Sequence, residues 1–257
     1  METPETIRPE AVTARIADAG RAIDAAMKAR TGFSHPVKLL AVTKTVPVDI
    51  INHAIDYCGI TAIGENRVQE LLEKYEQLHA PKDGKLEIHL IGSLQTNKVK
   101  YIIDKVDMIE SVDSIKLAAE IDRQAKKHER TMDILVEVNI GREPQKGGVM
   151  PEELSDFIDA LAPFENLRLR GLMTIAPKCD NKSDYLRYFS ETYQIFQVIS
   201  QKTLDISMKK LHNIYGASFD VLSMGMSTSF PEAIACGSTE IRLGSTLFGA
   251  RVYPLQN

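Results

Sequence analysis

The stretch that decides the fold is Thr239-Glu240-Ile241-Arg242-Leu243-Gly244, near the end of the chain. It alternates as a β-strand does, so Ile241 and Leu243 point to one face and Glu240 and Arg242 to the other. In a closed barrel the apolar face packs on outer helices, which directs Glu240 and Arg242 into the barrel. Charged side chains in such a place are costly unless they are paired or used, so this strand also marks a candidate functional region.

Seven more stretches upstream have the β-branched composition of strands, and amphipathic stretches separate them. Together the predicted strands are 38–43, 60–64, 86–91, 107–112, 132–140, 167–174, 219–225 and 239–243. The predicted helices include 48–57, 67–78, 96–104, 114–128, 152–161 and 185–200. Eight strand–helix units in about 250 residues are typical of a (β/α)8 TIM barrel. A doubly wound open sheet uses the same units and is the structural alternative.

One more helix is predicted before the first strand, because residues 9–30 carry apolar side chains at helical spacing, such as Ile16, Ala19 and Ile23. No linker, composition break or low-complexity segment divides the chain. We therefore predict that residues 1–257 form one α/β domain, a single (β/α)8 TIM barrel with an extra N-terminal helix.

The composition excludes several classes of protein. The 257 residues include 31 Lys and Arg against 35 Asp and Glu, which gives a net charge of −4 and no basic footprint for nucleic acid. No apolar run approaches the ~18 residues of a membrane span, and the N-terminus lacks a secretory signal. The three scattered cysteines form neither a disulfide framework nor a CxxC metal motif. We therefore expect a cytoplasmic protein that binds neither nucleic acid nor membranes.

Two other predicted strands also place polar side chains on the inner face. In the third strand His89 shares a face with Glu87, and in the fifth Glu137 lies opposite the apolar residues. An internal ion-pair network that only stabilises the barrel would explain Glu137 and Glu240. For Arg242 a functional role is favoured, because the loop that follows its strand has the composition of a phosphate-binding loop.

The loops after the last two predicted strands have the chemistry of a phosphate site, and TIM barrels often bind phosphate there. Residues 223–229 (SMGMSTS) and Gly244-Ser245-Thr246 supply glycines, hydroxyls and backbone N–H groups at predicted helix starts. Ser229 and Glu232 also fit a capping box, so ordinary helix capping is the alternative for part of this pattern. Two such loops on these two strands favour a phosphate site.

Lys44 ends the first predicted strand. A lysine at a strand end is usually a solvated surface charge. Partial burial would instead favour its neutral amine, the form that makes a Schiff base. A lysine and a phosphate cradle at one barrel mouth indicate a phosphorylated aldehyde, and pyridoxal 5′-phosphate (PLP) is the obvious such ligand. Arg242 could then donate a hydrogen bond to the pyridine nitrogen and keep that nitrogen unprotonated.

Several motifs in order along the chain resemble one known family. They are LAVTKT (40–45), GENRVQE (64–70), HLIGSLQTNK (89–98), VNI (138–140), GLMT (171–174), SMGMS (223–227) and GSTEIRLG (237–244). The chain resembles the pyridoxal phosphate homeostasis proteins, which are relatives of the alanine racemase N-terminal barrel. The resemblance spans about residues 10–253 and depends on many motifs in the same order.

The resemblance implies roles for individual residues. Lys44 would carry PLP as a Schiff base, Arg242 would face the pyridine nitrogen, and Asn66 would lie beside the ring. The phosphate would be held by Ser227, Gly244 and Ser245.

Three further positions have open roles: Met224 and His89 lie within matching motifs, and Ser229 lies two residues after the SMGMS motif. Met224 is included among the predicted cofactor-binding residues, with core packing as its alternative. His89 could contact the cofactor or be a hydrogen-bonded interior histidine. Ser229 stands where the family usually has an acidic residue, so any electrostatic or partner-binding role of that acid is in question, while Ser229 can still cap a helix.

These features predict a protein that binds PLP in intracellular PLP homeostasis and buffers or delivers the cofactor without robust catalysis. PLP-dependent apo-enzymes are its expected partners. A PLP racemase needs a second base, which in the alanine racemases is a tyrosine from a separate C-terminal domain. The chain ends at residue 257, too soon after Gly244 for such a domain, so we expect a monomer. A weak, broad-specificity amino-acid racemase is the alternative.

The sequence also bears on two other enzyme classes. The six histidines have no HxH or HExxH spacing, so no metal site is predicted, and this argues against a D-threonine aldolase. A barrel lyase with a Schiff-base lysine that acts on sugar phosphates without PLP is a third alternative.

Overall fold

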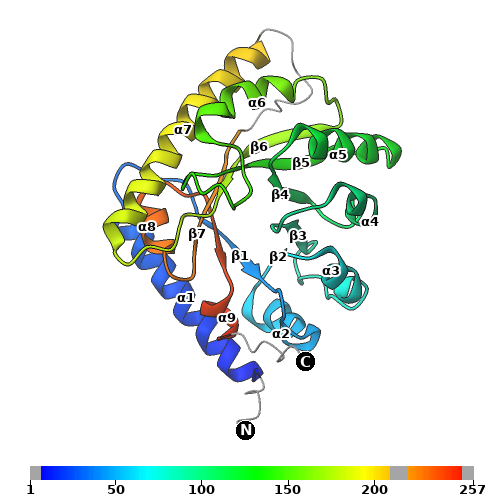
Figure 1. Cartoon of the computed structure of the whole chain (residues 1–257). Coiled ribbons are helices and arrows are strands. Elements are labelled where there is room, and N and C mark those ends of the chain that lie inside the picture. Colours follow the sequence, from blue (N-terminus) through cyan, green and yellow to red (C-terminus); the bar gives the residue numbers. More distant parts are fainter. Residues whose placement is uncertain (1–6, 209–218, 251–257) are drawn as a thin grey trace.

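The strand Glu240–Leu243 (β8) pairs in parallel with the first strand, Lys38–Val42 (β1), and closes the sheet into a barrel (Figure 1). The computed structural model describes residues 7–208 and 219–250. Because β1 and β8 are paired, the sheet is not the open doubly wound alternative, and the predicted barrel is confirmed. Within the described residues the strands between them are β2 (Ala62–Glu65), β3 (Glu87–Leu90), β4 (Met108–Val112), β5 (Met132–Val138), β6 (Leu167–Thr174) and β7 (Val221–Met226).

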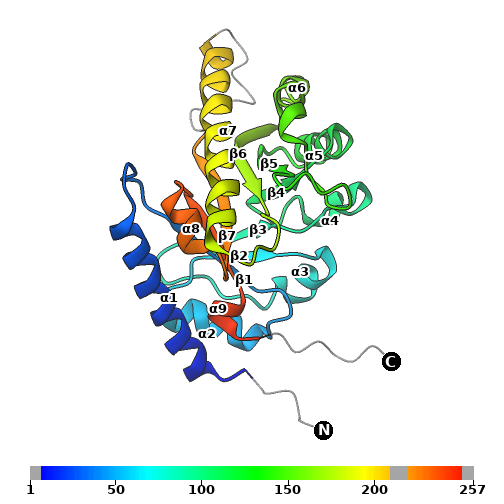
Figure 2. The same cartoon turned by 60° about the vertical axis from the view of Figure 1, so that its left-hand side comes forward.

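Helices lie around the outside of the strands (Figures 1 and 2). They are α1 (Pro9–Ala29), α2 (Val48–Cys58), α3 (Val68–Tyr75), α4 (Val99–Ile102), α5 (Ile115–Lys127), α6 (Leu154–Ala160), α7 (Lys182–Met208), α8 (Phe230–Ala235) and α9 (Ser245–Phe248). The short 3₁₀ turns η1 (Thr96–Lys98) and η2 (Pro151–Glu153) lead into α4 and α6.

The predicted N-terminal helix is confirmed as α1, which packs on α2, α8 and α9 on the outside of the barrel (Figure 2). Its buried residues Val12, Ile16, Ala19 and Ile23 form the apolar face that the spacing predicts. In the described part of the chain, no helix combines the length and the apolar character needed to cross a membrane.

Three predicted helices are shorter than the sequence pattern suggests, and one of them, 152–161, divides into η2 and α6. The predicted helix 67–78 ends at Tyr75, because Gln77 N donates to Lys74 O and Leu78 N to Tyr75 O in tight i to i+3 bonds. The predicted helix 96–104 divides into η1 and α4. Such turns keep nearly helical side-chain spacing, so the apolar pattern continues past the regular helix.

The main hydrophobic core lies between the barrel and the helices. The outward residues of β8, Ile241 and Leu243, are fully buried in it, as are the outward residues of β5. Among the described residues, the apolar clusters inside the barrel are small: Leu40, Val42, Ala62 and Ile91 form one, and Met108, Leu135 and Met173 form the other. The inward residues Glu240 and Arg242 are 2% and 4% exposed, so the predicted inward direction of this charged pair is confirmed.

Candidate functional site

Lys44 follows β1 in a tight turn at the C-terminal end of the barrel. The next residue, Thr45, has a φ of 63°, in the left-handed region that β-branched residues rarely adopt. Val46 N donates to Thr43 O at 3.0 Å and closes the turn. Backbone strain of this kind persists only where surrounding contacts hold it, and it is common at functional sites.

Those contacts come from Lys74 on α3. Its ammonium group donates to the backbone oxygen of Thr43 at 2.9 Å, to Glu65 Oε1 at 3.0 Å and to Glu70 Oε1 at 2.6 Å. Lys74 is only 8% exposed, so its charge is stabilised by these oxygens more than by water. We call Lys74, Glu65 and Glu70 the Lys74 cluster.

The two carboxylates of the Lys74 cluster contact both sides of the turn. Thr43 Oγ1 donates to Glu65 Oε1 at 2.7 Å, and Thr45 N donates to Glu70 Oε1. Glu65 is fully buried, which raises its pKa above the usual value although the charge of Lys74 acts in the opposite direction. The turn is therefore tied through side-chain and backbone atoms to one ion cluster.

A cavity of about 240 Å³ opens at the C-terminal ends of the strands. Ligand pockets for drug-sized molecules are about 300–1,000 Å³, so this cavity suits a ligand with a single ring. Every predicted cofactor-binding residue except Met224 lines it. The lining residues are Val42, Lys44, Asn66, Ile91, Ile175, Met226, Ser227, Thr228, Arg242, Gly244 and Ser245.

The apolar part of this lining was missed in the sequence. Ile175 and Met226 are 38% and 36% exposed, and Ile91 is buried. Apolar residues at strand ends look like ordinary core, so nothing marked Ile175 as part of a site, and Met226 was not singled out although it lies within the SMGMS motif. The signal for Ile91 was present, because it is two residues after the inward-facing His89 and so shares its face.

The loops after β7 and β8 meet at Ser227. Its Oγ accepts hydrogen bonds from Gly244 N at 3.4 Å and Thr246 N at 3.2 Å. Gly225 brings the end of β7 against α8: its φ is 97°, and a Cβ there would lie 2.5 Å from Cβ of Ala233. Hydroxyl and backbone N–H groups thus converge at one end of the cavity, and such groups can bind an anion.

Met224 lies outside the cavity. It is fully buried in the main core, on the outward face of β7, whereas its neighbour Ser223 points inward. The cavity is lined instead by Met226. This position matches the core-packing alternative for Met224.

The predicted capping box at Ser229 is wrong. Ser229 stands before α8, but its side chain makes no cap hydrogen bond to that helix. Its Oγ instead accepts from Met226 N at 3.3 Å, and its N–H donates to Met226 O at 2.9 Å. A serine hydroxyl that bonds within its own turn is no longer available to the helix start.

The side chain of Arg242 lies in the barrel interior and lines the cavity, and hydrogen bonds fix its guanidinium group. Its Nη1 donates to Ser223 Oγ at 2.7 Å, and its Nη2 donates to the backbone oxygen of Thr174 at 2.8 Å. Ser223 in turn donates to Glu110 Oε2 at 2.7 Å. All four residues are at least 96% buried, so the guanidinium has little freedom to move.

Behind Arg242 the barrel interior is polar. His89 Nδ1 lies 2.6 Å from Glu110 Oε1, and His89 Nε2 lies 2.7 Å from Glu87 Oε1. Lys38 Nζ contacts Glu87 at 2.5 Å and Glu240 Oε2 at 3.5 Å. The interior therefore holds a continuous chain of hydrogen bonds and ion pairs, and the predicted ion-pair network is present at Glu240.

The pKa shifts of this network follow from burial and charge. Burial lowers the pKa of His89, but hydrogen bonds to Glu110 and Glu87 and the charge of Glu240 together raise it to about 10. Burial raises the pKa of Glu110, but the hydrogen bond and charge of His89 outweigh this and hold it below its usual value. Burial and the charge of Glu110 raise the pKa of Glu240 to about 7. His89 is therefore an imidazolium at neutral pH.

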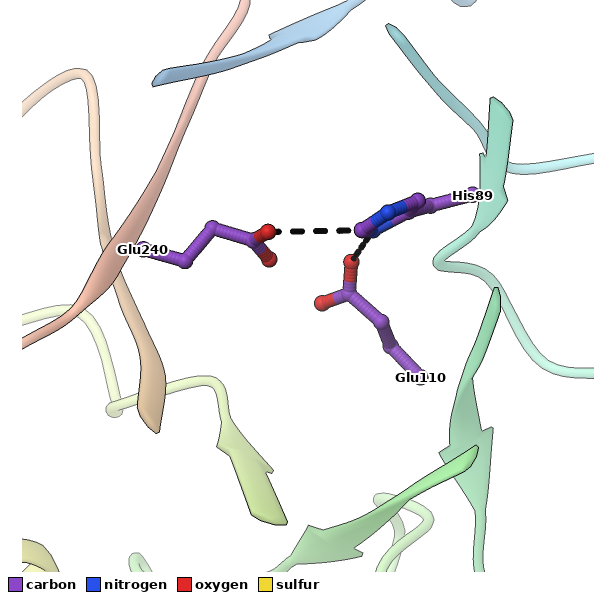
Figure 3. Close-up of side chains that lie close together, drawn as sticks. All are labelled: His89, Glu110 and Glu240. Atoms are coloured by element: carbon purple, nitrogen blue, oxygen red, sulfur yellow. Dashed lines mark hydrogen bonds and ion pairs between the residues drawn. The ribbon is translucent and has the colours of Figure 1, made fainter. Parts of the chain in front are cut away.

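The side chains of His89, Glu110 and Glu240 converge inside the barrel (Figure 3). One ligand atom from each lies within 4.8 Å of the others, an arrangement that could hold a metal ion. Both nitrogens of His89 contact carboxylate oxygens, so both carry protons and neither offers a lone pair to a metal. We assign the group as an imidazolium–carboxylate cluster.

Glu137 on β5 differs from the ion-pair prediction. It makes none of the ion pairs found among the described residues, although Arg242 is near enough to affect it. Burial and the charge of Asp113 raise the pKa of Glu137 to about 7, while the charge of Arg242 opposes the rise.

The fold and site define a class of protein. Residues 21–252 match the family model of the alanine racemase N-terminal domain. A protein of Bifidobacterium adolescentis with a solved structure is 31% identical, with a TM-score of 0.80 over 96% of this chain and 98% of that one.

Similarity to named proteins identifies the family within this class. The pyridoxal phosphate homeostasis protein of Aquifex aeolicus (strain VF5) is 43% identical over 216 residues, 84% of this chain and 88% of that one. PipY of Synechococcus elongatus PCC7942, whose structure was solved with PLP bound, is 30% identical, with a TM-score of 0.73 over 93% of this chain and 100% of that one. The chain belongs to the pyridoxal phosphate homeostasis protein family, as its motifs predict.

Proposed function

We propose that this protein binds PLP in the cavity at the C-terminal end of the barrel and acts in intracellular PLP homeostasis. The observation that carries the proposal is that Lys44, Arg242 and Ser227 line one cavity of about 240 Å³ although they are far apart in the sequence. An amine, a guanidinium and a hydroxyl with neighbouring N–H groups match an aldehyde, a pyridine nitrogen and a phosphate. The PLP bound to PipY supports the same ligand.

The roles of the residues follow from their chemistry. The amine of Lys44 would form a C=N bond with the aldehyde carbon, and the carbonyl oxygen would leave as water. Ser227, Gly244 and Ser245 would hold the phosphate, and Asn66 would lie beside the ring. Arg242 can only donate hydrogen bonds, so it would keep the pyridine nitrogen unprotonated.

This arrangement favours holding the cofactor over catalysis with it. PLP supplies a reactive aldehyde and a ring that accepts electrons, and the ring is a weaker electron sink when its nitrogen is unprotonated. The guanidinium of Arg242 is fixed by Ser223 and Thr174, so its side chain cannot turn away from the ring end of the cavity without losing both bonds. We therefore propose a role in buffering PLP or delivering it to apo-enzymes.

The absorbance of the purified protein tests the proposal. The wild type should show the visible band of a PLP Schiff base, and Lys44→Ala should lack it. Lys127→Ala, which removes an exposed lysine at the end of α5, is the matched control and should keep the band. A band that persists in Lys44→Ala would refute the assignment of Lys44. Sustained D-amino-acid formation that depends on Lys44 would favour the racemase alternative.

A further inference from the structure

Lys74 has no part in the proposed cofactor contacts. It is nevertheless a buried cation beside the turn that carries Lys44. It lies on α3, does not line the cavity, and is 8% exposed. A lysine in a short amphipathic helix is normally on the solvated face. Its burial on the side of the Lys44 turn therefore needs a reason.

The contacts of the Lys74 cluster supply one. Lys74 Nζ donates to the backbone oxygen of Thr43 at 2.9 Å, directly before Lys44. Glu70, held by Lys74 at 2.6 Å, accepts from the backbone nitrogen of Thr45, directly after it. One ion cluster thus fixes the peptide groups on both sides of a single side chain.

The strain in the turn makes these contacts necessary. Thr45 has a φ of 63°, which a β-branched residue leaves when nothing holds it. Glu65 is fully buried and its Oε2 makes no hydrogen bond among the described residues, so Lys74 and Thr43 at Oε1 stabilise its charge. Without Lys74 the carboxylates lose their cation and the turn can relax.

We infer that Lys74, together with Glu65 and Glu70, is a positioning residue that aims Lys44 at the aldehyde and so sets the rate at which Lys44 captures it. The inference rests on the proposed function, because it needs Lys44 to be the residue that reacts. It concerns the covalent step, since the proposed phosphate contacts, Ser227, Gly244 and Ser245, lie in the loops after β7 and β8.

Two ligands distinguish covalent capture of the aldehyde by Lys44 from noncovalent binding in the cavity. PLP has the aldehyde, whereas pyridoxine 5′-phosphate has an alcohol in its place and can only bind noncovalently. In Lys74→Met, stopped-flow absorbance should show Schiff-base formation slowed at least about tenfold, within the 100-fold that a misplacement of about 1 Å can cost. The dissociation constant of pyridoxine 5′-phosphate, measured by calorimetry, should stay at the wild-type value.

A second variant keeps the test decisive if Lys74→Met does not fold. Glu70→Ala removes the acceptor of Thr45 N at a partly exposed position and leaves the bonds of Lys74 to Glu65 and Thr43. It should show the same selective loss of rate. Glu73→Gln, an exposed change on the same helix, is the control and should react like the wild type.

The outcomes are distinct from those that test the proposed function. Wild-type capture rates in both Lys74→Met and Glu70→Ala would overturn the inference, and so would an equal loss of rate and of pyridoxine 5′-phosphate affinity, which indicates a general structural role. Failure of the proposed function has a different signature, a Schiff-base band that survives Lys44→Ala.

Discussion

Replacement of His89 by leucine tests the charge of the barrel interior. The side chain is fully buried between Glu110 at 2.6 Å and Glu87 at 2.7 Å, with Glu240 at 3.8 Å. Lys38 also pairs with Glu87 and Glu240, and its Nζ lies 3.4 Å from His89 Nε2, while the charge of Arg242 acts on Glu110. His89→Leu keeps a similar volume but leaves the buried carboxylate of Glu110 without its imidazolium.

The magnitude can be worked from the pKa of His89. A rise from 6.5 to about 10 favours the charged form in the folded protein by about 5 kcal/mol at low pH. Because the folded pKa lies above the unfolded one, this stabilisation is complete below pH 6.5, is about 4 kcal/mol at pH 7, and is lost as the pH rises through 10. Removal of one partner of a buried ion pair typically costs about 3–5 kcal/mol, in agreement with this value.

The assay is urea denaturation of the cofactor-free protein, followed by circular dichroism between pH 6 and 10. We expect His89→Leu to lower the free energy of unfolding by about 4 kcal/mol at pH 7 and to remove much of the decline above pH 6.5. His128→Leu, a change at an exposed histidine, is the control. The double variant His89→Leu/Glu110→Leu should recover part of the loss, because it removes both charges. A loss under 1 kcal/mol, with the wild-type pH profile retained, would refute the reasoning.

Two changes at the phosphate end of the cavity have separate expectations. Ser227→Ala should weaken PLP retention, measured by equilibrium dialysis, with little change in the stability of the cofactor-free protein. An equal loss of stability with and without PLP would instead show that Ser227 only connects the loops after β7 and β8. Gly225→Ala should lower the free energy of unfolding by about 2–4 kcal/mol, because the backbone φ there is 97° and the new Cβ would lie 2.5 Å from Cβ of Ala233. Thermal melts would check this, and an unchanged melting temperature would contradict it.

Much of the fold could be predicted because its signals are local. The alternation of residues 239–244 gave the inward direction of Arg242, and eight strand–helix units gave the barrel. The same rule of alternation could have placed Met224 in the core, since Ser223 points inward and the next residue must point outward. Membership of a motif does not say which face a residue occupies.

Other parts of the site have no local signal. Lys74 resembles any lysine of an amphipathic helix, and its burial depends on Glu65, which comes from a different element. Glu110 lies within an apolar strand, and its partners Ser223 and His89 are distant in the sequence. Contacts of this kind follow from the closure of the barrel, so they appear only in three dimensions.

The identity of the lysine that holds the cofactor tests the central claim most directly. Borohydride would reduce the Schiff base in the purified protein, and mass spectrometry of its peptides would then locate and weigh the adduct. We predict a phosphopyridoxyl adduct on Lys44, with the other lysines unmodified. A phosphopyridoxyl group on a different lysine, or a sugar phosphate on Lys44, would contradict the account.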